Sequence, residues 1–436
     1  MKLSKRQIYL IGGGVVLALA FVVVILVNLR SGDPGSQKVT LTVWGFEEPR
    51  NLQAVFAAYR KTSPNVTVDY KKVSVTGYED QLLEALALQR GPDVFVLDNN
   101  SIIRQREKLA PVDPQVFGLE RIKALFPQAV EQDFVSGGRI YGLPYSLDTL
   151  ALLYNRDFFD EAGIIEPPKT WEAFQSYVSA LRRLNDFGAV TRAGAAFGGA
   201  KETISQAADI FSLLLMQNKG VVYERESLGV TLNFRTRGEA YKALAFYLQF
   251  SDPKSSFYTW SGNQGDSIKS FADKKAAMIL GYKEDLEAIK KTNPFLDFGI
   301  APAPQISGDG DVISHPDYLG FVVSKQSKAQ TWAWDFIINT ATNVSSQREY
   351  MRSARKPPAL RFLIGEMVND SEMGVFARQA LTARSWLQVD GGKVEEILNE
   401  AIANALYNDA DYDSVLKKAR DEIVKLLGTY KIKVNG

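Results

Sequence analysis

The sequence predicts an α/β protein of two lobes, in which mostly parallel sheets are flanked by helices. Strand-like and helix-like apolar patterns alternate from residue 39 onward. A chain of 436 residues is too long for one ordinary hydrophobic core, so two or three domains are expected. The stretch Arg139–Asp157 joins a Gly-Leu-Pro turn to an apolar run, which suits a buried strand at a crossover between two domains.

The N-terminal part of the chain is apolar. Residues 8–29 carry no charge and are long enough to cross a bilayer as a helix. Basic residues gather before this stretch, so the positive-inside rule places residues 1–7 in the cytoplasm. A cleaved signal peptide is the competing interpretation, but no small-residue cleavage motif follows. We expect an uncleaved single-pass anchor in the cell membrane, a flexible linker over residues 30–38, and an extracellular or periplasmic remainder.

The next segment predicts the sheet of the first lobe. Apolar residues alternate with polar ones at 39–43 and 66–70, and a continuous apolar run occupies 93–97, so three strands are predicted. Apolar residues at helical spacing predict helices around 52–59 and 82–86. The order strand, helix, strand, helix, strand is typical of a mostly parallel sheet that is covered by helices.

Polar and aromatic residues follow the first and third of these strands. In open sheets of this kind, ligands bind beyond the carboxyl ends of the strands. Trp44 and Glu47 follow the first strand, and Asp98 and Asn99 follow the third. A tryptophan offers a flat apolar face, and carboxylates accept hydrogen bonds from hydroxyls. These residues are predicted to line a cleft; a packed tryptophan and an ordinary Asp-Asn turn are the alternative interpretations.

Several later residues receive structural roles. Thr170 is predicted to cap a helix that buries Trp171. Helical spacing places Trp332 in the core and leaves Trp334 at the surface or an interface. The aspartates of 409–413 lack the pattern of a calcium loop and are expected to cap the final helix.

Composition excludes several function classes. With 51 Lys and Arg against 50 Asp and Glu, nothing favours nucleic acid as a partner. The chain contains no cysteine, so disulfides, thiolate metal sites and thiol nucleophiles are absent. His315 is the single histidine, and no phosphate-binding loop is present. We therefore expect no metal, no cofactor and no catalytic group.

Five segments resemble, in the same order, family 1 of the extracellular solute-binding proteins of ABC importers, the maltose-binding-protein family. They are Arg139–Asp157 and the shorter stretches LTVW at 41–44, GPDVF at 91–95, PKTWEAF at 168–174 and FADKKAAMILG at 271–281. The resemblance implies the two-lobed periplasmic-binding-protein-like fold (type II). It implies a lobe 1 of 39–146 plus 322–370, a lobe 2 of 151–318 plus 371–436, and hinge crossings near 147–150 and 319–323.

The resemblance also implies a function. A small solute, with a mono- or oligosaccharide as the first choice, would be captured between the lobes by hinge closure of a monomer and delivered to ABC permease subunits. By family position the cleft would hold Trp44, Glu47, Asp98, Asn99, Tyr145, Asp148, Tyr282 and Trp386, with Trp260 and Lys283 as additions. Lys283 beside Tyr282 departs from the family pattern and counts against a purely neutral sugar.

Two other functions stay open at this point. An extracellular carbohydrate-active hydrolase would use an acid pair such as Glu47 and Asp148 to flank a glycosidic bond. An anchored scaffold without a ligand would have a cleft filled by side chains.

Overall fold

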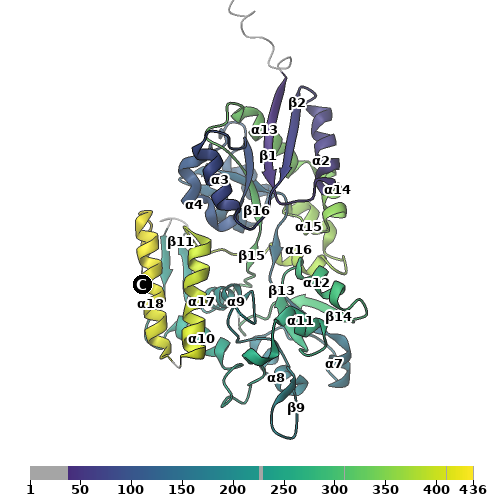
Figure 1. Cartoon of the computed structure of the whole chain (residues 1–436), viewed down its shortest axis with the longest axis vertical. Coiled ribbons are helices and arrows are strands. Elements are labelled where there is room, and N and C mark those ends of the chain that lie inside the picture. Colours follow the sequence, from purple (N-terminus) through teal and green to yellow (C-terminus); the bar gives the residue numbers. More distant parts are fainter. Residues whose placement is uncertain (1–37, 225–228, 309, 409, 436) are drawn as a thin grey trace, which may run out of the picture.

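Two lobes, each with its own hydrophobic core, make up the computed structural model (Figure 1). The structure describes residues 38–224, 229–308, 310–408 and 410–435. The predicted cytoplasmic segment and membrane anchor lie outside these residues. No helix within the described ranges is both long enough and apolar enough to cross a membrane.

Lobe 1 is built on a five-stranded sheet in the order β2-β1-β3-β16-β6. Its strands are β1 (Val39–Gly45), β2 (Val66–Lys72), β3 (Val94–Asp98), β6 (Gly142–Pro144) and β16 (Leu319–Val323). As the alternating pattern predicts, β1 pairs in parallel with β2 and β3. The return strand β16 is antiparallel to both β3 and β6.

Helices cover this sheet because each has an apolar face that needs burial. In α2 (Pro49–Thr62), for example, Leu52, Val55 and Tyr59 are buried. The remaining helices of lobe 1 are α3 (Tyr78–Ala87), α4 (Ile102–Gln105), α5 (Leu119–Leu125), α6 (Gln128–Phe134), α13 (Gln330–Thr342), α14 (Val344–Ala354) and α15 (Arg361–Met367). A short hairpin pairs β4 (Val135–Ser136) with β5 (Arg139–Ile140).

Of the two tryptophans in α13, the prediction is wrong for Trp334. Trp334 is buried and donates its indole N–H to the Ala110 carbonyl at 3.0 Å, whereas Trp332 is only partly buried and packs against the same core. A helical period fixes which residues share a face but not which face meets the sheet. The buried hydrogen bond with Ala110 accompanies the burial of Trp334.

Lobe 2 contains a three-stranded sheet in the order β13-β8-β14. Its strands are β8 (Ala151–Asn155), β13 (Met278–Gly281) and β14 (Phe298–Pro302), and β8 is antiparallel to both neighbours. The prediction of a mostly parallel sheet is therefore wrong for this lobe. The apolar run of β8 predicts a buried strand, but it carries no information on the direction of the partner strands.

Helices and small hairpins complete lobe 2. The helices are α7 (Arg156–Glu161), α8 (Trp171–Leu181), α9 (Ala207–Gln217), α10 (Glu239–Leu248), α11 (Ser267–Ala272), α12 (Asp285–Thr292), α17 (Gly391–Tyr407) and α18 (Tyr412–Thr429). One hairpin joins β9 (Arg183–Leu184) to β10 (Val190–Arg192), and β11 (Val221–Glu224), β12 (Gly229–Leu232) and β17 (Lys433–Asn435) form a further sheet.

The predicted caps of lobe 2 are confirmed. Thr170 accepts a hydrogen bond from the Ala173 N–H at 3.2 Å, and Trp171, the first residue of α8, is buried. Asp411 accepts one from the Ser414 N–H at 3.0 Å at the start of α18. These bonds satisfy backbone donors that the first helical turn leaves without partners.

Three segments connect the lobes. Two of them form a short antiparallel ribbon between β7 (Asp148–Thr149) and β15 (Pro316–Asp317). The third leads from α16 (Gly374–Ala380) to α17 and pairs with the second at Ser314 and Ala383. Paired crossings of this kind permit hinge bending and restrict free swinging.

Candidate functional site

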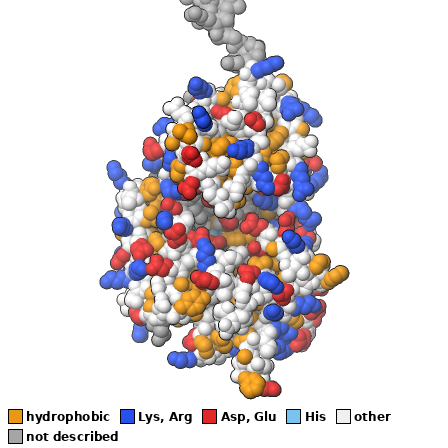
Figure 2. Space-filling model, viewed as in Figure 1, with side chains coloured by type: hydrophobic (Ala, Val, Ile, Leu, Met, Phe, Trp, Pro, Cys, Tyr) orange, Lys and Arg blue, Asp and Glu red, His pale blue; other side chains and the backbone are white. Residues whose placement is uncertain are grey.

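A cavity of about 270 Å³ lies between the lobes, where β3 ends. Lobe 1 contributes the turn that begins at Asp98, lobe 2 contributes α9 and the start of α17, and the crossing ribbon contributes His315 and Asp317. The surface is visibly hollowed between the two lobes, and Asp and Glu side chains lie around this hollow (Figure 2). Both lobes and the ribbon supply the walls of the cavity. A molecule bound there would therefore contact the two lobes, which move in a hinge motion, and the ribbon that connects them.

The end of β3 positions Asp98 and Asn99. The strand is a buried apolar run, VFVL, and the chain then enters a turn of 3-10 helix over Asn99–Ser101. Asp98 therefore leaves the sheet at its carboxyl end and reaches the cavity. The Asp98 residue is exposed at the cavity, but the protein around its carboxyl reduces hydration and raises its pKa, and the nearby Glu79 raises it further. These two residues are where strand order predicts ligand contacts.

On the lobe 2 side, a chain of hydrogen bonds orients two groups. The Tyr282 hydroxyl donates to Asp209 Oδ2 at 2.9 Å and lies 3.1 Å from His315 Nδ1. Burial raises the pKa of Asp209 and lowers the pKa of His315, so the imidazole is neutral near pH 7. Tyr282 itself is 3% exposed and offers no open ring face. The sequence predicts that the Tyr282 ring stacks against a ligand. In the structure its hydroxyl instead orients Asp209 and His315, which line the cavity.

Asp148 ties the ribbon to lobe 2. Its carboxylate accepts the Thr149 N–H at 2.8 Å and the Lys283 N–H at 2.9 Å. It pairs across the ribbon with Asp317. Burial raises the pKa of Asp148 to about 7, against the opposing effect of the two N–H donors. Neither Asp148 nor Lys283 lines the cavity; both lie behind it.

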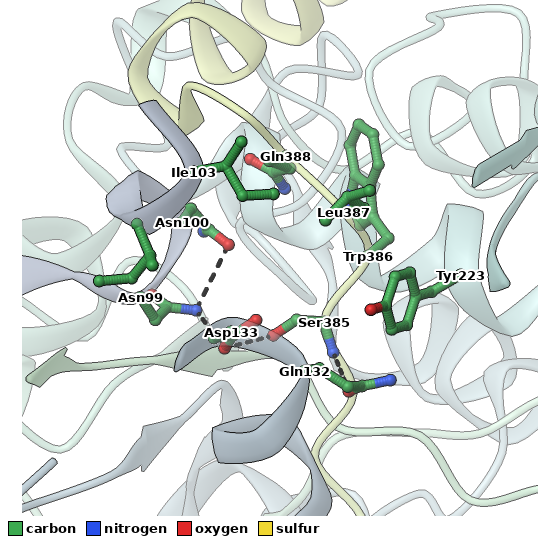
Figure 3. Close-up of a pocket in the computed structure, with 11 residues that line it drawn as sticks. Asn99, Asn100, Ile103, Gln132, Asp133, Tyr223, Ser385, Trp386, Leu387 and Gln388 are labelled. Atoms are coloured by element: carbon green, nitrogen blue, oxygen red, sulfur yellow. Dashed lines mark hydrogen bonds between the residues drawn. The ribbon is translucent and has the colours of Figure 1, made fainter. Parts of the chain in front are cut away.

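The carboxylate of Asp133 links lobe 1 to the third crossing segment by hydrogen bonds. Asp133 Oδ2 in α6 accepts hydrogen bonds from Asn99 Nδ2 at 2.9 Å, the Tyr318 hydroxyl at 2.6 Å and the Ser385 hydroxyl at 2.9 Å. Figure 3 shows Asn99, Asp133 and Ser385 converging, with Trp386 next to them. Burial raises the pKa of Asp133 to about 6, although the three donors oppose the shift.

Trp386 lines two pockets that are separate from the cavity of Asp98. It is 2% exposed, and its indole N–H has no hydrogen-bond partner within the described ranges. The tryptophan lines the small pocket of Figure 3 together with Asn99, and it also lines a larger cavity of about 740 Å³ together with Arg384 and Lys219. It does not line the cavity of Asp98.

The lobes touch at the start of α17. A Cβ on Gly391 would lie 2.6 Å from the Cβ of Asn100, so only glycine permits this approach without displacement. Beside it, Arg104 of lobe 1 lies 3.3 Å from Asp390, which caps α17. These contacts fix one wall of the cavity against the other.

Besides Asp148, Tyr282, Lys283 and Trp386, four further predicted cleft residues lie outside the cavity. Lys71 lies over the Trp44 ring at 4.6 Å, and Glu47 is engaged by Lys356 at 2.6 Å and by the Tyr350 hydroxyl at 3.1 Å. Tyr145 packs against Phe321 and Tyr350 in the core of lobe 1, with ring centroids 4.7 and 5.2 Å apart. Trp260 is wholly buried and donates to the Thr203 hydroxyl at 3.1 Å. In each case, partners within the same lobe occupy the side chain.

Three cavity residues escape sequence reasoning. Asp209 is the one acid in the apolar helix AADIFSLLLMQ, and a lone carboxylate on a buried helix is a usable signal. Asp317 could be found by the same rule as Asp98. It precedes β16, which is antiparallel to β3, so it lies at the edge of the sheet where β3 ends. For the single histidine, His315, the sequence argues only against a metal site. A histidine can also serve as a neutral hydrogen-bonding group.

Comparisons with known proteins agree with this architecture. A model of the family described as bacterial extracellular solute-binding protein matches residues 54–361. The maltotriose-binding protein of Pyrococcus abyssi is 24% identical over 91% of this chain and 84% of that protein. The galactooligosaccharide-binding protein of Bacillus subtilis is 23% identical over 78% of this chain and 76% of its own length. A substrate-binding protein of Listeria monocytogenes, solved with cycloalternan, superposes with a TM-score of 0.69 at 20% identity, covering 91% of this chain and all of that one.

Proposed function

The chain belongs to the bacterial extracellular solute-binding proteins, and from this premise we infer that it is the receptor of an ABC importer for a carbohydrate. The observation that carries the proposal is the cavity at the end of β3, which takes walls from both lobes and from the crossing ribbon. A solute bound there gains contacts to the second lobe only when the lobes are together. Binding therefore shifts the equilibrium toward the closed form.

The walls of the cavity suit hydroxyl-rich molecules. Carboxylates accept strong hydrogen bonds from hydroxyl groups, and Asp98, Asp209 and Asp317 all line the cavity. The relatives named above bind maltotriose and galacto-oligosaccharides by their names, which supports an oligosaccharide as the solute. The closed receptor would then be presented to a permease, and the apolar stretch at residues 8–29 would hold it at the membrane.

The two other functions have less support. The acid pair of the hydrolase hypothesis is not assembled, because Glu47 is bound by Lys356 and Tyr350 and neither Glu47 nor Asp148 lines the cavity. A scaffold without a ligand would have a filled cleft. The cavity has room for a small molecule.

Isothermal titration calorimetry against maltotriose, galacto-oligosaccharides and their monosaccharides tests the proposal. We expect saturable binding of at least one sugar, with no product after prolonged incubation. Asp98→Ala should weaken that binding roughly tenfold or more, the scale of one charge-assisted hydrogen bond. The matched control is Asp186→Ala, in the exposed loop between β9 and β10, which should leave affinity unchanged. Turnover of a sugar, or the absence of binding across the panel, would refute the receptor hypothesis.

A further inference from the structure

The charge of the interlobe cavity has one sign. Four carboxylates line it, from Asp98, Asp209, Asp317 and Glu395, and its described lining contains neither lysine nor arginine. Two cations that act on these acids are already paired: Lys201 lies 2.6 Å from Glu395, and Arg104 contacts Asp390 and Glu79. Burial raises the pKa of Asp98, Asp209 and Asp317, so a cation that enters the cavity would stabilise the charged form of these carboxyls.

His315 adds an acceptor to this wall. The Tyr282 hydroxyl uses its proton to donate to Asp209, so its oxygen can only accept from His315 Nδ1. The Nδ1 atom thus carries the single proton of the neutral ring, and Nε2 presents a lone pair. His315 is 7% exposed and lines the cavity, and no hydrogen bond to Nε2 occurs within the described part of the chain.

Two further polar side chains in the cavity lack partners. Ser212 is 3% exposed, lines the cavity from α9, and makes no side-chain hydrogen bond to any described residue. The Asp317 residue is exposed to solvent, and its carboxylate has no donor among the described residues, although the opposite residue, Asp148, has two. Both groups are therefore free to exchange water for the hydrogen-bonding groups of a ligand.

A metal ion does not meet this need. Within the described residues, no three His, Asp or Glu side chains are grouped closely enough to hold one. The acceptors are instead spread over walls from α9, α17, β3 and the crossing ribbon. They suit a molecule several atoms across that carries hydrogen-bond donors along its length.

We propose that the solute is an amino sugar, in which at least one free amino group is protonated and the other substituents are hydroxyls. This rests on the proposed function, because it takes a carbohydrate as the solute and adds the charge. A protonated amine donates up to three hydrogen bonds and accepts none, so it matches walls made of acceptors. It also neutralises carboxylates that a neutral sugar leaves unpaired. Acetylation of the amine removes both properties.

Sugars that differ only in the group at C2 test the contribution of the protonated amine. Cellobiose, chitobiose with free amino groups and diacetylchitobiose share one backbone and differ only at C2. Glucose with glucosamine, and galactose with galactosamine, provide the same comparison in monosaccharides. Calorimetry near pH 7 in low salt should show the free amine binding at least tenfold more tightly than its hydroxyl counterpart in any set that binds, and more tightly than diacetylchitobiose in the disaccharide set. Raising the salt concentration should reduce this preference.

Variants locate the preference in the cavity. Asp317→Asn and, independently, Asp98→Asn should reduce the ratio of amine to hydroxyl affinity several-fold, while Asp186→Asn on the exposed loop should not change it. Thermal unfolding shows whether each variant is folded, and two variants allow one to fail. Equal or tighter binding of the neutral or N-acetylated sugar in every set that binds would overturn the proposal and leave the receptor function standing. The absence of binding by every sugar would overturn both.

Discussion

Replacing Asp148 by asparagine should change the pH dependence of stability. The pKa of this carboxyl is about 7 in the folded protein, against an ordinary value of 3.8, because the group is buried in the crossing ribbon. Between these values the folded protein holds a proton that the unfolded chain releases. The free energy of unfolding therefore falls as pH rises through this window. Asparagine has no proton to lose, so the variant should lack this contribution.

The magnitude follows from the shift. A shift of about three pKa units changes the free energy of unfolding by roughly 4 kcal/mol in all, at 1.36 kcal/mol per unit. About 3 kcal/mol of this change occurs between pH 5 and pH 8. Against this, the amide can accept only one of the two N–H bonds from Thr149 and Lys283, which costs about 1–3 kcal/mol at every pH. The variant should thus be less stable than the parent near pH 5 and should regain about 3 kcal/mol relative to it by pH 8.

Urea unfolding at a series of pH values, followed by tryptophan fluorescence, measures this difference directly. Asp186→Asn, on the exposed loop between β9 and β10, is the control and should follow the parent at every pH. If the curves for Asp148→Asn and the parent stay parallel from pH 5 to pH 8, the carboxyl titrates normally and the reasoning about its burial fails.

Three other changes have defined outcomes. Asp133→Ala removes the shared acceptor of Asn99, Tyr318 and Ser385, and urea unfolding should show a loss of about 3–5 kcal/mol; a loss below about 1 kcal/mol would mean that water replaces the carboxylate. Tyr282→Phe should keep the packing but release Asp209 and His315, so calorimetry should show weaker sugar binding with little change in stability. Thr170→Ala should lower the free energy of unfolding by about 1 kcal/mol through loss of the α8 cap, and unchanged affinity would separate this effect from the site.

Local patterns were sufficient to predict the first parallel strands of lobe 1 and the helix between them. Alternation along β1 and β2 and helical spacing along α2 are properties of neighbouring residues, and the parallel pairing follows from the intervening helix. The direction of β13 and β14 beside β8 depends on chain paths that no local pattern records. The same is true of Trp334, whose burial depends on the Ala110 carbonyl far away in the sequence.

The site shows the same division. Asp98 and Asn99 were predictable because strand ends converge on one edge of a sheet. Asp209, His315 and Asp317 reach the cavity from a helix and from the crossing ribbon, and their meeting point depends on the packing of both lobes. Tyr145 and Trp260 carry side chains suited to a ligand, but each is buried in the core of its own lobe.

The central claim is that the two lobes close around a solute, and the absence of cysteine makes this directly measurable. Cysteines introduced at the exposed Gln81 in α3 and Lys417 in α18 would be the only labelling sites, one on each lobe. Spin labels at these positions report the distance between the lobes. Saturation with a sugar that binds by calorimetry should convert a broad or bimodal distance distribution into a single narrow population. A distribution that stays unchanged at saturation would contradict hinge closure.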